Sequence, residues 1–319
     1  MLGNILLASN LFLSCKPPAT SNSSARLEYC DAIAVTQDGK TLVAAGRDII
    51  TTTTIETAKL SRTIGLDDEH FFFTCVSVSP DGKMVATGGH RALSDAFTEF
   101  GEVKLWQLPE INNGRTLARY PDFISSVLFS PDGKQLAIAC GDTIDLWETS
   151  TWKKSRVLND THEISALAFA HDGSRLASAN KRGMIKIWRF PKGDVAQTFT
   201  QSPNPLGPDY WIRSLAFTPD GRQLASAAHE GVFIWDFGTA KVAKRFLGDY
   251  DTPSFSPDGK VLAVGGNGKI HLLDTETGGE LRTHSIIPKG RCLAAFTSDG
   301  KFLASAGYDG TTLFFRSSE

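Results

Sequence analysis

Residues 130–147 read SPDGKQLAIACGDTIDLW: a turn, a short apolar segment, a second turn and a segment that ends in tryptophan. The opening five-residue turn returns with small changes along the whole chain. Its seven copies are TQDGK (36–40), SPDGK (79–83), SPDGK (130–134), AHDGS (170–174), TPDGR (218–222), SPDGK (256–260) and TSDGK (297–301). They are about 40 to 50 residues apart, a period that is typical of propeller blades and longer than most helical repeats.

Each turn is the predicted centre of a β-hairpin. Proline presets φ, aspartate can bond the turn backbone through its carboxylate, and glycine accepts the positive φ that closes the turn. Short apolar segments flank the turns, for example Val127–Ser130 before the third and Leu136–Ala139 after it. The segment Pro253–Ser256 begins with proline and is the weakest of the set. Each repeat therefore predicts two paired strands.

A third strand follows in each repeat and carries a large apolar residue at a constant place. That residue is tryptophan in four repeats and Ile55, Leu273 or Phe315 in the others; the tryptophans are Trp106, Trp147, Trp188 and Trp235. The second repeat has an insertion of about ten residues within His90–Gly101, in the loop before this strand. A more polar fourth strand follows, for example Ala243–Phe246.

The combined pattern, SPDGK–x–LA(S)–x–DG–x–(K)–L/I–W, resembles the WD40-repeat family in a degenerate, bacterial-type form, over roughly Leu27 to Arg316. The resemblance implies an all-β fold, a seven-bladed β-propeller of four-stranded antiparallel blades. Only Trp235–Asp236 keeps the dipeptide that names the family. The family's His–Ser–Asp–Trp network is complete in no repeat. We therefore expect stability to rest on apolar packing between blades more than on buried polar networks.

The N-terminal segment has two interpretations. We divide the chain into residues 1–26, an N-terminal segment, and residues 27–319, the propeller. Ile5–Leu13 (ILLASNLFL) can supply the missing outer strand of the last blade and close the ring. Alternatively, the apolar run ending at Cys15 resembles a lipoprotein signal, although residues 1–14 lack the Lys or Arg of a secretory signal. We expect a cytoplasmic protein, with lipid anchoring or export as the alternative.

Candidate binding residues come from one position of the repeat. The resemblance implies that the Asp-Gly turns lie on the bottom face, and that the residue nine places before each turn aspartate lies on the top face near the channel. Aromatic residues fill this position in four repeats, and rigid aromatic side chains are typical of interaction hot spots. With two flanking basic residues, the predicted partner-binding set is Tyr29, Phe72, Phe123, Trp211, Arg47 and His229. The alternative is that the rings pack against neighbouring blades.

Composition and motifs give little sign of chemistry. Lys plus Arg (33) nearly balances Asp plus Glu (35), so no global field attracts nucleic acid. No apolar run is long enough to span a bilayer, and the seven histidines form no metal motif. We expect no cofactor, a monomeric propeller and a protein or peptide partner. One alternative is a hydrolase- or lyase-type propeller enzyme at the channel mouth. The polar side chains expected there form a poor constellation: Asp31, Arg213, Asp251 and Cys292, with Thr74, Ser125 and Ser165 between them. A second alternative is a structural subunit of a larger assembly.

Overall fold

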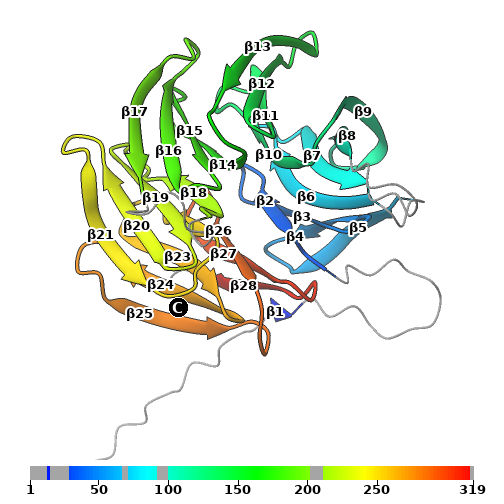
Figure 1. Ribbon diagram of the computed structural model, residues 1–319. Coiled ribbons are helices and arrows are strands. Elements are labelled where there is room, and N and C mark those ends of the chain that lie inside the picture. The colour runs from blue at the N-terminus through cyan, green and yellow to red at the C-terminus, as the bar shows by residue number, and fades with distance from the viewer. Residues whose placement is uncertain (1–12, 15–28, 67–70, 92–99, 202–210, 317–319) are drawn as a thin grey trace, which may run out of the picture.

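The computed structural model describes residues 13–14, 29–66, 71–91, 100–201 and 211–316. Their 28 strands form seven four-stranded antiparallel sheets. The sheets stand around a central axis as the blades of a propeller (Figure 1). The predicted fold class is confirmed.

In the first six blades, consecutive strands follow one another outwards from the axis. The innermost strands are β2 (Ala32–Val35), β6 (Phe71–Val78), β10 (Ile124–Phe129), β14 (Ile164–Phe169), β18 (Ser214–Phe217), β22 (Pro253–Phe255) and β26 (Cys292–Phe296). The second strands are β3 (Thr41–Gly46), β7 (Met84–Arg91), β11 (Gln135–Cys140), β15 (Arg175–Asn180), β19 (Gln223–Ala228), β23 (Val261–Gly266) and β27 (Phe302–Gly307).

The tryptophan-bearing third strands and the outermost strands complete the blades. The third strands are β4 (Ile49–Thr54), β8 (Phe100–Gln107), β12 (Thr143–Glu148), β16 (Met184–Arg189), β20 (Gly231–Asp236), β24 (Lys269–Asp274) and β28 (Thr312–Arg316). The outermost strands of the first six blades are β5 (Lys59–Gly65), β9 (Asn112–Tyr120), β13 (Lys153–Asn159), β17 (Val195–Thr200), β21 (Lys241–Leu247) and β25 (Glu280–Ser285).

The seventh blade draws its outer strand from the other end of the chain. A two-residue strand, β1 (Leu13–Ser14), pairs antiparallel with β28, with Leu13 opposite Phe314 and Ser14 opposite Leu313. On the inner side, β26 contacts β2, so the ring of innermost strands is continuous. Of the expected closing segment Ile5–Leu13, only Leu13 lies within the described residues. The expected division between residues 26 and 27 lies outside them.

One prediction about the third strands is wrong. In the other blades the residue of interest lies opposite a leucine or valine of the second strand, as Trp147 lies opposite Leu136. In the first blade the residue opposite Leu42 is Thr53, not Ile55. Ile55 follows the strand and is fully buried. The spacing from Gly39 to Thr53 equals that from Gly133 to Trp147, so the loop has the same length in both blades. Ile55 was misplaced because a large apolar residue was expected at this position and Thr53 is polar.

The repeated turns are built as their sequence predicts. All seven turn glycines have φ between 66° and 72°, a region that residues with a side chain rarely adopt. In the second blade, Ser79 Oγ donates a hydrogen bond to Asp81 Oδ1 over 2.6 Å. The same carboxylate oxygen accepts the Lys83 backbone N–H at 3.0 Å. The serine predicted to end the first strand therefore belongs to the turn.

These turns give a pH-dependent contribution to stability. Hydrogen bonds from neighbouring hydroxyl and backbone N–H groups lower the pKa of all seven turn aspartates, and lower that of Asp299 to about 2. A carboxyl whose pKa is lower in the folded state stabilises that state above its unfolded pKa, and the contribution disappears as pH falls through the folded pKa. We therefore expect the urea midpoint to be level above about pH 4.5 and to fall towards about pH 2.

The matched variant is Asp299→Asn, which keeps the size of the side chain and removes its charge. Its urea midpoint should lie below that of the native protein at neutral pH, and the gap should close in acid. A gap that stays constant from neutral pH to pH 2 would contradict this account of the turn.

Small residues make the second strands fit between two neighbouring blades. In β11, β15, β19, β23 and β27, every residue after the first is buried. Separate apolar clusters fill the interfaces between successive blades. Between the fourth and fifth blades, for example, Ile187 and Phe199 share a cluster with Trp235. The expected apolar packing between blades is present.

Buried polar networks are also present, which corrects part of the expectation. In the fourth blade Trp188 Nε1 donates to Ser178 Oγ at 3.0 Å, and Ser178 Oγ donates to Asp160 at 3.2 Å. In the fifth blade Trp235 Nε1 donates to Ser226 Oγ at 2.8 Å, and Ser226 bonds Gln201 at 2.7 Å. Asp160 and Gln201 each directly follow the outer strand of the preceding blade. An acid or an amide thus completes networks that lack the family's histidine.

The seventh blade supplies a natural contrast. Ser305 occupies the place of Ser178 and Ser226, but Phe315 replaces the tryptophan and has no N–H to donate. Among the described residues, the buried Ser305 Oγ has no hydrogen-bond partner. Because a buried hydroxyl without a partner is destabilising, Ser305→Ala should leave stability unchanged or raise it. Ser178→Ala should lower the free energy of unfolding by about 1 to 3 kcal/mol. Urea denaturation of both variants tests the contrast, and an equal loss in both would contradict it.

Candidate functional site

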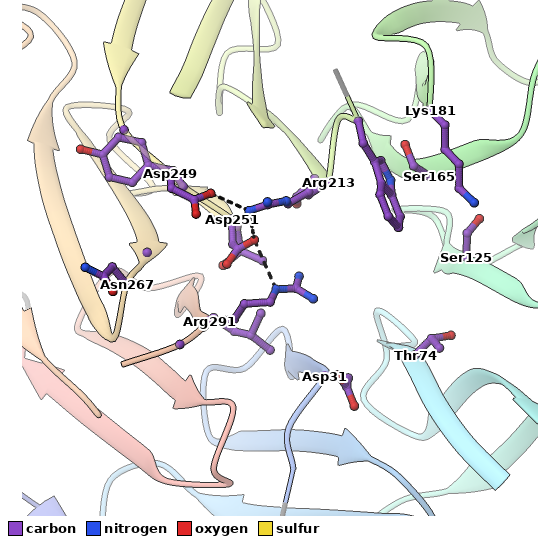
Figure 2. Close-up of a pocket in the computed structure, with 18 of the residues that line it drawn as sticks. Asp31, Thr74, Ser125, Ser165, Lys181, Arg213, Asp249, Asp251, Asn267 and Arg291 are labelled. Atoms are coloured by element: carbon purple, nitrogen blue, oxygen red, sulfur yellow. Dashed lines mark hydrogen bonds and ion pairs between the residues drawn. The ribbon is translucent and has the colours of Figure 1, made fainter. Parts of the chain in front are cut away.

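A pocket of about 930 Å³ opens on one face of the propeller. Residues from all seven blades line it, and most of them come just before or at the start of an innermost strand (Figure 2). We call this face the top face and the opposite face, with the seven Asp-Gly turns, the bottom face. Phe123, Trp211, Asp249 and Gly290 of the predicted top-face position line the pocket. Tyr29, Phe72, Arg47 and His229 are not part of its lining.

The rings of the second to fifth blades form a connected series that we call the aromatic arc. Phe72 stacks on His90 with ring centroids 5.4 Å apart, and His90 meets the edge of Phe123 at 6.5 Å. Lys181 Nζ lies 5.0 Å from the centroid of Phe123 and 5.1 Å from that of Trp211. Cationic or polar side chains thus separate the predicted aromatics, which do not touch one another directly.

The two ends of the aromatic arc differ in exposure. Phe72 and Phe123 are half-buried, and each has a ring face against a neighbouring side chain. Trp211 is 49% exposed although it is a large apolar residue. An ion pair with Glu163 holds Lys181 in place between the two rings. Trp211 is therefore the ring of the arc that a partner can contact most extensively.

The fifth to seventh blades contribute a chain of charges that we call the ionic arc. His229 Nδ1 lies 3.2 Å from Asp249, and Arg213 Nη1 bridges Asp249 (2.8 Å) and Asp251 (3.0 Å). Arg291 Nε then lies 3.3 Å from the same Asp251 oxygen. Burial raises the pKa of Asp249, but His229 and Arg213 outweigh it, so the pKa lies below its ordinary value. The predicted residue His229 therefore supports a carboxylate at the pocket rim.

Tyr29 and Arg47 form a separate group in the first blade. The Arg47 guanidinium lies 4.7 Å above the Tyr29 ring, and Tyr29 packs on Tyr308 at 5.1 Å. Of the six predicted binding residues, Phe123 and Trp211 line the pocket. His229 contacts the lining residue Asp249, Phe72 reaches Phe123 through His90, and Tyr29 with Arg47 forms another patch.

The side chains considered for catalysis serve mainly to connect blades. Thr74 Oγ1 donates to the carbonyl of Ile124 in the next blade at 2.6 Å, and Ser165 Oγ donates to that of Ile212 at 2.6 Å. The Asp251 carboxylate joins the ionic arc. Cys292 is buried, and burial raises its thiol pKa to about 12. A thiol with such a pKa is a poor nucleophile near neutral pH.

Asp31 is the exception among these side chains. Burial raises its carboxyl pKa, and the nearby positive charges of Arg291 and His90 oppose that shift. Within the described ranges no hydrogen bond or ion pair engages its carboxylate.

Among the described residues, no group of three or more His, Cys, Asp or Glu side chains is placed to hold a metal ion. In the same part of the chain, no helix has the length and hydropathy to cross a membrane.

Sequence comparison agrees with this architecture. Residues 62–93, 113–148, 152–189, 198–236 and 276–316 match the sequence model of the family described as WD domain, G-beta repeat. Together these stretches make up more than half of the chain. The chain belongs to the WD40 family. A typical match begins in or near the outer strand of one blade and ends on the third strand of the next, as 113–148 does from β9 to β12.

Curated relatives cover parts of this WD40 chain. It is 28% identical over 255 residues to Periodic tryptophan protein 2 of Saccharomyces cerevisiae. The aligned region covers 76% of this chain and 26% of the relative. It is 27% identical over 128 residues to Small ribosomal subunit protein RACK1 of Drosophila melanogaster, covering 37% of each chain. The matched region therefore spans about a quarter to a third of the length of these relatives.

Several residues of the site were not predicted from sequence. Neither His90, the first residue of the inserted loop, nor Lys181 belongs to the predicted binding set. Arg291 and Lys289 flank Gly290, the residue that fills the top-face position of the seventh repeat. Their place beside the top-face position could have identified them, but glycine at that position has no side chain that would indicate a binding residue.

Proposed function

We propose that this WD40 propeller is a non-catalytic scaffold that binds a protein or peptide at its top face. The observation that carries the proposal is Trp211, a half-exposed tryptophan at the rim of a pocket of about 930 Å³. Tryptophan at the edge of a concave site is typical of interaction hot spots. Lys181 lies against one side of the ring, so that binding requires little further ordering.

The same geometry argues against the enzyme alternative. Asp249 and Asp251 are each paired with a guanidinium, so that their carboxylate oxygens are already engaged. Thr74 and Ser165 donate their hydroxyl protons to backbone carbonyls of neighbouring blades. Acid–base catalysis needs a group whose protonation can change against a substrate atom. Among the described side chains considered for catalysis, Asp31 is the one carboxyl without a hydrogen bond or ion pair, and one carboxyl makes a weak case for a hydrolase or lyase.

The test is affinity capture from native lysate followed by mass spectrometry. The bait is compared as native protein, as Trp211→Ala and as Leu281→Ala. Leu281 is a matched control because it is also an exposed apolar residue, but lies on the outer strand β25. A partner retained by the native protein and Leu281→Ala, and lost by Trp211→Ala, supports the proposal. Equal recovery by all three would contradict it and favour a structural role on another face.

The remaining properties are proposals of the same kind. We propose a monomer that does not bind nucleic acid, supported by the near balance of acidic and basic residues. Light scattering of the purified protein and a binding assay with labelled RNA and DNA test these two points. Binding of labelled RNA or DNA would indicate a basic surface that the composition does not show, and it would overturn the proposal that the protein does not bind nucleic acid.

We also propose a cytoplasmic location. Cys30, Cys75, Cys140 and Cys292 are free thiols, and burial raises the pKa of each. This usage fits a reducing compartment. Cys15, the residue of the lipoprotein alternative, lies outside the described residues. Cell fractionation of the native protein and Cys15→Ser separates the two: a membrane fraction that depends on Cys15 would contradict the proposal.

A further inference from the structure

Arg291 is held in the pocket in a way that leaves the two terminal nitrogens of its guanidinium available. Its Nε lies 3.3 Å from Asp251, whose side chain is only 4% exposed. In the described part of the chain, no hydrogen bond or ion pair engages its two terminal nitrogens, and its side chain is 51% exposed. Figure 2 shows the guanidinium turned towards the open centre of the pocket, towards Ser125 and Thr74.

The contact with Asp251 orients the Arg291 guanidinium so that it can bind an anion. Asp251 fixes the guanidinium through Nε, and the outer pair of N–H groups has the spacing that binds a carboxylate through two parallel hydrogen bonds. Lys289 adds a second cation to the same lining. Asp249, the other carboxylate of the ionic arc, contacts both Arg213 and His229.

The opposite wall of the pocket is aromatic. Phe123 and Trp211 both belong to the lining, and Trp211 exposes about half of its surface. A bound segment that reaches Arg291 therefore crosses a cavity whose other side favours a large apolar side chain.

We propose that the pocket binds a segment of a protein partner through a carboxylate held by Arg291, with an adjacent apolar side chain on Trp211. The inference rests on the proposed function and specifies the chemistry of its ligand. The carboxylate is that of an aspartate or glutamate side chain or of a chain terminus, which make the same hydrogen bonds.

Asp31 gives a second test of the ligand's charge, because this acidic side chain lines the same pocket as Arg291. A carboxylate bound at Arg291 is repelled by Asp31, whereas a cationic ligand would be attracted by it. Arg291→Gln and Asp31→Asn should therefore change affinity in opposite directions, and the sign for each identifies the charge of the ligand.

The experiment uses a random dodecapeptide phage library selected on the intact protein, counter-selected on Trp211→Ala. The strongest binders are then synthesised with a fluorophore and titrated against variants by anisotropy. We expect an acidic residue or a required free C-terminus in these peptides. Arg291→Gln should weaken binding by roughly tenfold to a hundredfold, the loss expected for a charge-assisted hydrogen-bond pair, and Asp31→Asn should strengthen it. The control Arg222→Gln, on an exposed bottom turn, should change nothing.

Peptides with each acid replaced by its amide, and with an amidated C-terminus, distinguish the two carboxylate sources. Trp211-dependent peptides that ignore Arg291, or that weaken with Asp31→Asn, would overturn this inference and leave the proposed function intact. A library that yields no Trp211-dependent peptide would count against both.

Discussion

Replacing Trp235 with alanine is expected to lower the free energy of unfolding by about 3 to 5 kcal/mol. Trp235 is 5% exposed and packs against Phe199 with ring centroids 5.1 Å apart. Its indole N–H donates to Ser226 at 2.8 Å. The substitution leaves a cavity at the interface of the fourth and fifth blades and also removes one of the two hydrogen-bond partners of the buried Ser226 hydroxyl.

Trp211→Ala is the control for this result. Trp211 is half-exposed and its ring contacts Lys181, so its loss should change stability by less than about 1 kcal/mol. Urea denaturation measures both. If Trp211→Ala were as unstable as Trp235→Ala, Trp211 would be part of the core and the top-face proposal would lose its main support.

The second large effect concerns the buried ion pair of Lys186 and Asp160. Lys186 Nζ lies 2.9 Å from Asp160, and the two side chains are 12% and 1% exposed. Lys186→Met keeps much of the apolar volume and leaves the carboxylate without its counter-charge. We expect a loss of about 3 kcal/mol, at the lower end for breaking a buried pair, because Ser178 and the Thr161 N–H still donate to Asp160.

The double variant separates charge from packing. In the background of Asp160→Asn, which removes the charge but keeps an acceptor, Lys186→Met should cost less than about 1 kcal/mol. The same large loss in both backgrounds would show that Lys186 acts through its packing on Trp188 and not through Asp160.

The fold was accessible from sequence because its signal is local and repeated. Each turn needs glycine at a positive φ and a carboxylate that bonds the next backbone N–H groups, as Gly82 and Asp81 show. These demands are satisfied within five residues, so the sequence displays them directly. The register error at Ile55 arose where the repeat carried no tryptophan to mark the place.

The buried networks were less accessible because they connect different blades. Asp160 completes the network around Ser178 and Gln201 the one around Ser226. Because the two residues differ in type, no single sequence motif identifies both. Ser305 ends the same Leu-Ala-Ser pattern, but its hydroxyl has no hydrogen-bond partner among the described residues. Side chains that meet only after the ring closes leave no spacing rule in the chain.

The candidate site was predicted in part for the same reason. The repeat position identified Phe123 and Trp211, since its placement follows from the turn. It did not reveal that Lys181 lies between the two rings, or that Asp251 anchors Arg291 from the neighbouring blade. Both are contacts between blades, and they change an expected aromatic cluster into a pocket with an aromatic and an ionic side.

The most direct test of the top-face proposal is site-specific photo-crosslinking in cells. A photoreactive phenylalanine analogue is placed singly at Trp211 on the top face, at Leu281 on the outer edge and at His171 on the bottom face. We predict a crosslinked partner from position 211 and none from the other two. A partner captured at position 171 or 281 but absent at 211 would contradict the proposed function.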